Sequence, residues 1–369
     1  MPIQEIRLHH LAMPLKHPFE TSFGRYAQRH CILVELFAEG QRAYGECPAD
    51  ANPGYSYETT GTVLEIAQRE LAPALLALPD PTPASFQEAV RHVKGHPMAK
   101  AGFEMALWDF QGRISGQSLV QMLGVARDRV PVGVSLGLEP TAEALLDKLQ
   151  RFVAQGYPRV KLKIKPGRDV DVVQTARTAF PDLKLQVDAN SAYTLESARE
   201  LKALEAFDLL MLEQPLAEDD LWDHSQLQKE VNIPICLDES IGAARHARQA
   251  LEMGACQIIN IKSGRVGGLL EALRIHDLSL AQGVPVWCGG MLETGVGRAA
   301  NLALAGLPGF TLPGDISATE RYYQRDITQE SFQLNPDGTI DIPHAPGLGV
   351  SIDQAALREY ALSSATISA

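Results

Sequence analysis

Residues 160–165 read VKLKIK, in which aliphatic and cationic side chains alternate with a period of two. This period is typical of a β-strand, so Lys161, Lys163 and Lys165 are expected on one face and the aliphatic residues on the other. The lysine face is either exposed to water on an antiparallel strand or directed into a binding site. The spacing of similar segments elsewhere in the chain decides between these two interpretations.

The segment belongs to a series of eight β-rich runs, from VPVGVSL (130–136) to FTLPGDIS (310–317), that alternate with longer amphipathic stretches. A polar residue follows the aliphatic residues at intervals of 24 or 25 positions, and the residues that set this spacing are Lys163, Asp188, Glu213, Asp238 and Lys262. Strands that alternate with helices indicate parallel βαβ units. Eight such units at nearly constant spacing predict an α/β fold of the (β/α)8 type, a TIM barrel, over residues 126–320.

The chain on either side of this repeat has a different organisation. Residues 1–125 predict an α+β domain, in which EIRLHHLAMPL and CILVELFAEGQRAYGEC read as strands and the second turns at Glu39-Gly40. Two loops rich in turn residues, HPFETSFGR and PADANPGYSYE, accompany these strands. Residues 321–369 contain no further repeat unit, and we expect them to pack back on the N-terminal domain.

Composition excludes several classes of protein. The formal net charge of −12 argues against nucleic acid or an anionic membrane as the main partner, because phosphate binding requires local positive charge. No segment resembles a signal peptide or a membrane span. The five cysteines are scattered without a CxxC pair, which makes a disulfide framework or a structural zinc site improbable. These features predict a cytoplasmic enzyme.

Three acidic residues, Asp188, Glu213 and Asp238, end successive predicted strands. The carboxyl ends of the strands form the active-site face of a barrel. Three carboxylates that converge there cannot all stay ionised without a cation, because like charges raise one another's pKa. An all-oxygen donor set suits a hard ion, whereas zinc would usually bring histidine or cysteine. The sequence therefore predicts Mg²⁺ at these carboxylates, with Mn²⁺ as a substitute.

Lysines occupy the strands on either side of the three acids. If VPVGVSL is strand one, Lys163 ends strand two and Lys262 ends strand six, so the two amines lie on opposite sides of the ring. The α-carbon of a carboxylate substrate on the metal would then lie between them. Bound Mg²⁺ would stabilise the enediolate that forms when the α-proton leaves. Lys161 shares the face of Lys163 and adds positive charge, whereas Lys165 is expected to be solvated.

With these residues the chain resembles the enolase superfamily, and within it the muconate-lactonising subgroup. The matching motifs are Lys161-Leu-Lys163, Asp188-Ala-Asn190, Glu213-Gln-Pro215, Asp238-Glu239-Ser240 and Lys262. Finer similarity to N-acylamino acid (N-succinylamino acid) racemases and o-succinylbenzoate synthases lies in FETSFG (19–24), GYPRVKLKIKPG (156–167), VDANSAYTL (187–195), PICLDES (234–240), NIKSGRVGG (260–268), VWCGGMLETGVGRAAN (286–301) and FTLPGDISA (310–318). The chain has no histidine in VPVWCGG, where the mandelate-racemase subgroup expects one.

The resemblance implies roles for individual residues. Lys163 and Lys262 would be the acid/base pair, with Asp188, Glu213 and Asp238 as metal ligands. The substrate-binding residues would be Ser135, Lys161, Asn190, Gly290 and Met291 in the barrel and Phe19, Ser22 and Tyr55 in capping-domain loops that close over the site. The family also implies a homo-oligomer.

The family supports two reactions on a small carboxylate substrate. One is racemisation of an N-acylamino acid, in which one lysine removes the α-proton and the other returns a proton to the opposite face. The other is syn dehydration to o-succinylbenzoate in menaquinone biosynthesis, with Lys163 as base and Lys262 as a stabilising cation. A dedicated synthase is the alternative to an enzyme with both activities. Arg265 matches a position typical of members with racemase activity, and Ser263 departs from the usual proline or alanine.

A different class of enzyme is suggested by Gly133-Val-Ser135-Leu-Gly137, which matches the G-x-S-x-G nucleophile elbow of serine hydrolases. The elbow requires a helix immediately after the serine. Here Leu138-Glu139-Pro140 intervenes, and no candidate catalytic triad follows in the required order. A serine hydrolase that uses Ser135 is therefore only a remote alternative.

Overall fold

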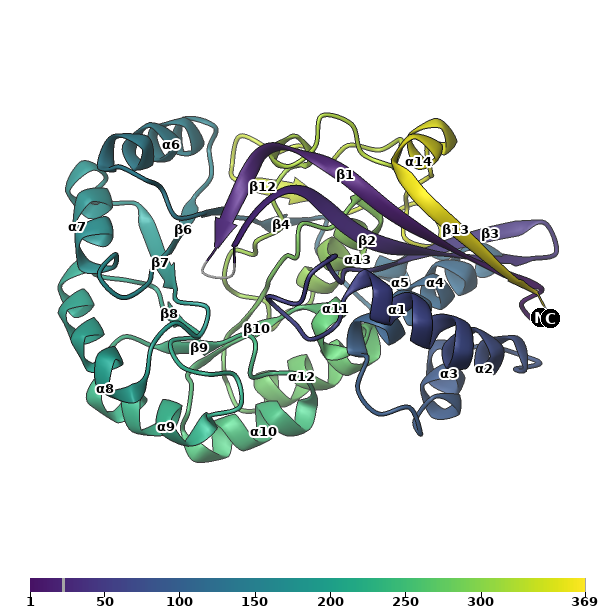
Figure 1. Cartoon of the computed structure of the whole chain (residues 1–369), viewed down its shortest axis with the longest axis horizontal. Helices are drawn as coiled ribbons and strands as arrows, with labels where there is room; N and C mark the ends of the chain where they lie inside the picture. Colours follow the sequence, from purple (N-terminus) through teal and green to yellow (C-terminus); the bar gives the residue numbers. More distant parts are fainter. Residues whose placement is uncertain (22–23, 369) are drawn as a thin grey trace.

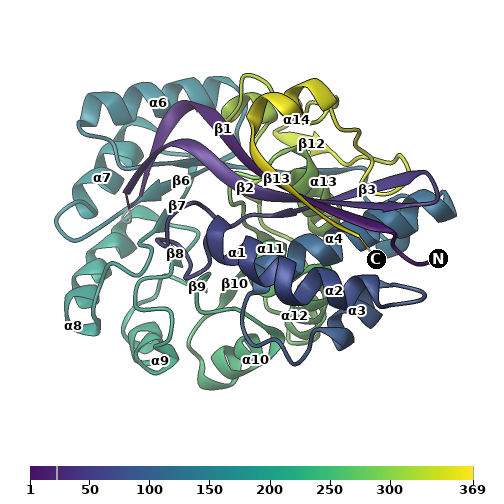
Figure 2. The same ribbon diagram turned by 45° about the vertical axis from the view of Figure 1, so that its right-hand side comes forward.

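A computed structural model describes residues 1–21 and 24–368. Its N-terminal part is built on an antiparallel sheet with the strand order β13-β1-β2-β3. The strands are β1 (Glu5–Thr21), β2 (Gly24–Ala38), β3 (Gln41–Cys47) and β13 (Ala361–Ser368). Strand β13 comes from the end of the chain and pairs with β1, so the two termini lie close together (Figure 2). Residues 5–21 and 361–368 thus share one sheet.

The turn between β2 and β3 shows how local sequence determines this sheet. Ala38 pairs with Gln41, so a two-residue loop joins the strands. Glu39 and Gly40 have φ angles of 48° and 81°, the positive values that such tight hairpins require. The predicted hairpin at Glu39-Gly40 is therefore confirmed.

Helices cover one side of the antiparallel sheet and connect it to the barrel (Figure 1). They are α1 (Thr60–Ile66), a π-helical turn (Ala67–Leu71), α2 (Ala72–Leu76), α3 (Pro83–Ala89), α4 (Pro97–Ser115) and α5 (Leu119–Leu123). Helix α4 packs most closely on β3, because Gly102 faces Cys47 where any β-carbon would overlap the cysteine sulfur.

The second part of the chain is a curved parallel sheet with the order β11-β10-β9-β8-β7-β6-β5. Its strands are β5 (Val134–Leu136), β6 (Arg159–Lys163), β7 (Lys184–Asp188), β8 (Leu212–Glu213), β9 (Ile235–Leu237), β10 (Ile258–Ile261) and β11 (Val286–Cys288). Sequence order equals spatial order, as in a barrel. The α/β barrel prediction is confirmed.

Helices surround this sheet on the outside (Figure 1). They are α6 (Ala142–Ala154), α7 (Val170–Ala179), α8 (Leu195–Ala198), a 3₁₀ helix (Arg199–Phe207), α9 (Leu221–Glu230), α10 (Ala244–Met253), α11 (Ser263–Val266), α12 (Leu269–Ala281) and α13 (Gly295–Ala305). The remaining elements are β4 (Arg129–Pro131), a 3₁₀ turn (Thr319–Arg321), β12 (Thr339–Asp341) and α14 (Gln354–Tyr360). Among the described residues, no helix has both the length and the apolar character needed to span a membrane.

The ring of strands closes through a segment that is not a regular strand. Phe310 bridges Val286 of β11, and Gly314 bridges Val132 beside β5. The backbone N–H of Asp315 donates to the Cys288 carbonyl at 2.8 Å. Pro313 lies within this segment and has no N–H to contribute to a ladder. The predicted eighth strand, 310–317, therefore closes the ring with isolated bridges.

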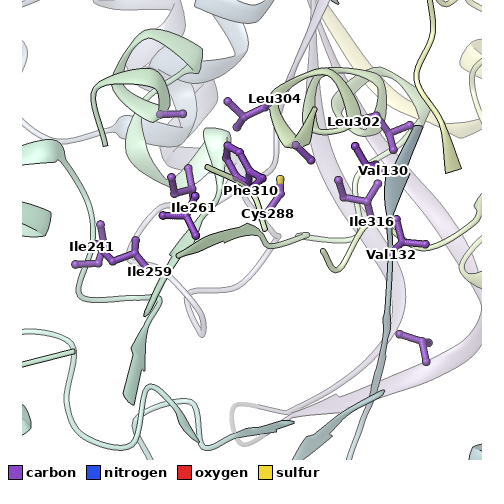
Figure 3. Packing of buried hydrophobic residues seen from close by; sticks show 14 of the residues in the cluster. Val130, Val132, Ile241, Ile259, Ile261, Cys288, Leu302, Leu304, Phe310 and Ile316 are labelled. Atoms are coloured by element: carbon purple, nitrogen blue, oxygen red, sulfur yellow. The ribbon is translucent and has the colours of Figure 1, made fainter. Parts of the chain in front are cut away.

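The first predicted strand, VPVGVSL, is also divided in the structure. Strand β4 ends at Pro131 and pairs with β12 outside the ring, whereas β5 begins at Val134 and pairs with β6. The predicted continuous strand over 130–136 is thus two short strands. Figure 3 shows Ile316 of the closing segment packed near Val130 and Val132, and Phe310 packed near Cys288.

Glu104 of α4 lies buried where the two parts of the chain meet. Its Oε1 accepts hydrogen bonds of 2.9 Å from the backbone N–H of Leu270, at the start of α12, and from Trp108 Nε1. Burial raises its pKa from 4.5 to about 7, although these hydrogen bonds oppose the shift. The carboxyl group is therefore protonated in the folded chain at pH values where it ionises in the unfolded chain.

This shift predicts that the Glu104 contribution destabilises the fold as pH rises. Between pH 4.5 and 7 the folded chain keeps a proton that the unfolded chain has lost, so the free energy of unfolding falls with rising pH, by on the order of 1 to 3 kcal/mol. Glu104→Gln should flatten this part of the profile. Thermal melting at pH 5 to 8 measures it, with Glu88→Gln on the exposed face of α3 as the control. Parallel profiles for Glu104→Gln and the wild type would contradict the assignment.

Candidate active site

Three carboxylates follow one another around the mouth of the barrel. Asp188 ends β7 and pairs in register with Glu213, which ends β8, while Asp238 directly follows β9. The side chains are at most 1% exposed. Their positions arise from the strands themselves, because each acid follows buried aliphatic residues at the carboxyl end of a parallel strand. The sequence spacing thus corresponds to spatial adjacency.

Two lysines of β6 contact these carboxylates. Lys161 Nζ lies 3.1 Å from Asp188 Oδ2, 3.0 Å from Glu213 Oε2 and 2.6 Å from Asp315 Oδ2. Lys163 Nζ lies 2.7 Å from Asp188 Oδ2 and also donates to Asn190 Oδ1. Both lysines are buried, so the lysine face of VKLKIK points into the barrel, while Lys165 is exposed. The interpretation of a solvated antiparallel strand is wrong.

Lys262 follows β10 and lies four strands from Lys163 in the sheet order. Its Nζ is 2.6 Å from Asp238 Oδ2 and donates to the Tyr55 hydroxyl at 3.0 Å. That hydroxyl donates to Asp238 Oδ1 at 3.0 Å, so the loop that carries Tyr55 reaches the mouth of the barrel from the N-terminal domain. The site thus combines residues from both parts of the chain.

Buried charges shift the ionisation of these groups. Burial alone would lower the pKa of Lys161, but the carboxylates of Asp315, Glu213 and Asp188 outweigh burial and raise it well above its usual value. Burial also opposes the charge of Lys262, and Tyr55, Glu239 and Glu213 raise its pKa. Burial, together with the charge of Asp188, raises the pKa of Glu213. In the arrangement described, therefore, ammonium groups balance the carboxylates.

The carboxylates fit a divalent cation in donor chemistry. They supply only oxygen atoms, which hard ions such as Mg²⁺ prefer. Among residues 1–21 and 24–368, no three His, Cys, Asp or Glu side chains come close enough together to form a metal-binding group as they stand. The ammonium groups of Lys161, Lys163 and Lys262 contact Glu213 Oε2, Asp188 Oδ2 and Asp238 Oδ2, respectively. The three buried carboxylates have the donor chemistry of a divalent-cation site. The Mg²⁺ assignment stays a prediction.

A cavity of about 130 Å³ lies between the barrel and the N-terminal domain, and it is lined by the lysines that contact the three carboxylates but not by the carboxylates themselves. Most of the residues predicted to bind substrate line it: Phe19, Tyr55, Ser135, Lys161, Asn190, Gly290 and Met291. Both candidate acid/base residues, Lys163 and Lys262, line it as well. Ser22, which was also predicted, lies outside the described residues. The structure brings the predicted groups together but does not test their roles.

Sequence reasoning missed the role of Asp315, and it singled out Arg265 only by resemblance, without its contact to Asp238. Asp315 forms ion pairs with Lys161 at 2.6 Å and with Arg159 at 2.5 Å, and it lines the cavity. Arg265 contacts Asp238 and donates to the Asn260 carbonyl at 2.6 Å, which fixes the carboxylate from behind. An acid at the end of the eighth predicted strand was the available signal for Asp315. The spacing of the strands does not show that Asp315 pairs with Lys161.

The geometry of Ser135 does not support a serine hydrolase. Ser135 lies in the middle of β5, and the next helix, α6, begins only at Ala142. A nucleophile elbow instead places the serine at a sharp turn from strand to helix. Within the described part of the chain, Ser135 Oγ has no hydrogen-bond partner and hence no activating base. The hydrolase alternative is not supported.

Comparison with known proteins agrees with this architecture. Residues 144–356 match the enolase C-terminal domain-like family, and residues 3–124 match the mandelate racemase/muconate lactonizing enzyme N-terminal domain family. The chain therefore belongs to the enolase superfamily, as its motifs predicted. Members of this superfamily generally bind Mg²⁺.

Three relatives illustrate the similarity. An o-succinylbenzoate synthase from Geobacillus kaustophilus is 49% identical over 97% of this chain and 96% of its own length. An N-succinylamino acid racemase from an Amycolatopsis species is 48% identical over 95% of each chain. A crystal structure of an enolase superfamily member from Listeria innocua superimposes with a TM-score of 0.95 at 41% identity, covering 100% of this chain and 99% of the other.

Proposed function

We propose that this protein removes the α-proton of a small carboxylate substrate and racemises N-succinylamino acids, with o-succinylbenzoate synthesis as a second activity. The observation that carries the proposal is the placement of Lys163 and Lys262, which line one cavity from strands four apart in the sheet. A dedicated o-succinylbenzoate synthase is the second candidate, because relatives of nearly equal identity bear one name or the other.

The lysines would exchange a proton with the substrate from opposite sides. For racemisation, the neutral amine on one side takes the α-proton while the ammonium group on the other side donates to the opposite face. For dehydration, Lys163 would act as the base and Lys262 would stay protonated, which its contact with Asp238 favours. Lys161 would remain an ammonium group in both reactions, because three carboxylates surround it.

Asp188, Glu213 and Asp238 would hold Mg²⁺, or Mn²⁺ in its place. When bound there, the ion would stabilise the negative charge that develops on the substrate carboxylate as the α-proton leaves. Asn260 Nδ2 donates to Glu213 Oε1 at 2.8 Å and would keep that carboxylate oriented.

The N-terminal domain, proposed to comprise residues 1–125, would exclude water from the reaction. Phe19, which lies in strand β1 and not in the predicted loop, lines the cavity from this domain together with Tyr55. Ser22 is proposed to bind the substrate as well. The C-terminal segment 321–369 contributes β13 to the same sheet and would fix the domain over the barrel domain, 126–320. A cytoplasmic location and a homo-oligomeric assembly stay predictions from the sequence and family.

Proton NMR of N-succinyl-L-phenylalanine with the enzyme and Mg²⁺ in D₂O tests the proposal. We expect the α-proton signal to disappear while optical rotation falls, because a two-base reaction exchanges the proton and inverts the centre. Exchange without loss of rotation would show that only one lysine acts on this ligand. If there is no exchange but the cyclohexadiene substrate is still converted, the protein is a dedicated o-succinylbenzoate synthase.

A further inference from the structure

Arg29 is a buried arginine that the reaction described above does not use. It lies on β2 of the N-terminal domain and lines the cavity, although its side chain is only 5% exposed. Its Nη1 lies 3.1 Å from Asp50 Oδ2, and its Nη2 donates to the Pro48 carbonyl. Its Nε has no hydrogen-bond partner within the described part of the chain. A buried guanidinium with an unused donor, at the wall of a reaction cavity, is suited to an anionic ligand.

Arg29 shares its cavity with Lys163 and Lys262, the candidate acid/base pair. Pro48 and Met291 both pack against Gly264, where a β-carbon would lie 2.4 Å from Pro48 Cγ and 2.7 Å from Met291 Cε. Arg29, Pro48 and Met291 all line the same cavity. The lysines that line this cavity, Lys161, Lys163 and Lys262, each contact at least one of the three carboxylates proposed to hold the metal, whereas Arg29 does not. A succinyl group ends in a second carboxylate, and Arg29 is positioned in the cavity lining to receive it.

We propose that Arg29 recognises the terminal carboxylate of the succinyl group and thereby selects N-succinyl over neutral N-acyl substrates. This inference rests on the proposed function and adds a residue that determines specificity. Asp50 holds the guanidinium in place in the free protein and shares it with the ligand carboxylate. Because Asp50 also partly neutralises Arg29, it limits the affinity for the second anion.

The two members of the ion pair should respond in opposite directions. The test compares kcat/KM for α-proton exchange of N-succinyl-L-phenylalanine with that of its terminal amide, N-succinamoyl-L-phenylalanine, which has the same shape without the charge. Loss of a charged hydrogen bond predicts that Arg29→Gln reduces the preference for the carboxylate by about tenfold to a hundredfold. Asp50→Asn should keep the preference or increase it, because the guanidinium loses its competing anion. Arg113→Gln, which removes a similar ion pair with Asp109 elsewhere in the N-terminal domain, should leave the preference unchanged.

Several outcomes would overturn the inference. Equal kcat/KM for the acid and the amide in the wild type would show that no group recognises the terminal charge, while the proposed function would stand. A reduced preference in Asp50→Asn, which can be measured even if Arg29→Gln does not fold, would show that the pair only positions the loop. If the wild type exchanges neither compound, the proposed racemase activity fails and this inference fails with it.

Discussion

Lys262→Ala is expected to abolish racemisation, with a loss of at least about 10³-fold, because one face of the substrate then has no proton donor or acceptor within reach. Lys163 stays on the other side of the cavity, held by Asp188 and Asn190. The variant should therefore still exchange the α-proton of the enantiomer whose proton faces Lys163. Proton exchange in D₂O, measured separately on the L and D substrates, distinguishes loss of one base from loss of the whole site.

A matched control removes a lysine that cannot take part. Lys184 is exposed at the beginning of β7, at the opposite end of the strand from Asp188, and Lys184→Ala should racemise at the wild-type rate. Racemisation by Lys262→Ala at a rate close to that of the wild type would show that the opposed lysines are not the acid/base pair. Loss of exchange for both enantiomers, together with a lower melting temperature, would instead indicate a damaged fold.

The barrel could be predicted because its signals are local and repeated. Aliphatic residues at a period of two define the strands. Each of these runs ends in a polar residue, about 25 positions after the polar residue of the previous run, and these residues define the edge at which the strand ends meet. In the structure, residues 25 positions apart become neighbours on adjacent strands: Lys163 pairs with Asp188, and Asp188 pairs with Glu213.

The details that sequence reasoning missed depend on contacts between distant segments. Asp315 lies more than 150 positions from Lys161 and Arg159, and no periodicity links an acid to the lysine that it will meet. Arg29 reaches the cavity only because the N-terminal domain packs over the barrel, and the spacing of strands within one domain does not describe that packing. Pro313 leaves the eighth predicted strand without one backbone donor, and the first predicted strand is divided between Pro131 and Val134, which its aliphatic pattern does not show.

Removal of divalent cations with a chelator should stop both proposed reactions. The carboxylates of Asp188, Glu213 and Asp238 are buried and face the cavity lysines, so without the ion nothing in the site stabilises the dianionic intermediate as strongly. Stabilisation of several kcal/mol corresponds to a loss of at least about 10³-fold, and added Mg²⁺ should restore the activity. Mn²⁺ is expected to substitute.

Calorimetric titration with Mg²⁺ separates metal binding from catalysis. Asp188→Asn should bind the ion much more weakly than the wild type, because it removes one of three anionic ligands and leaves an amide oxygen. Asp171→Asn, on the exposed face of α7, serves as the control and should bind normally. Full activity in a preparation that retains less than about one metal ion per hundred chains would contradict the metal assignment, because the lysines would then have to balance the charge of the intermediate alone.

The lysines are poorly placed to do so without the ion. Four cationic groups contact these acids: Lys161, Lys163, Lys262 and Arg265. Each is paired with a carboxylate of the protein, so none has its full charge available for the substrate.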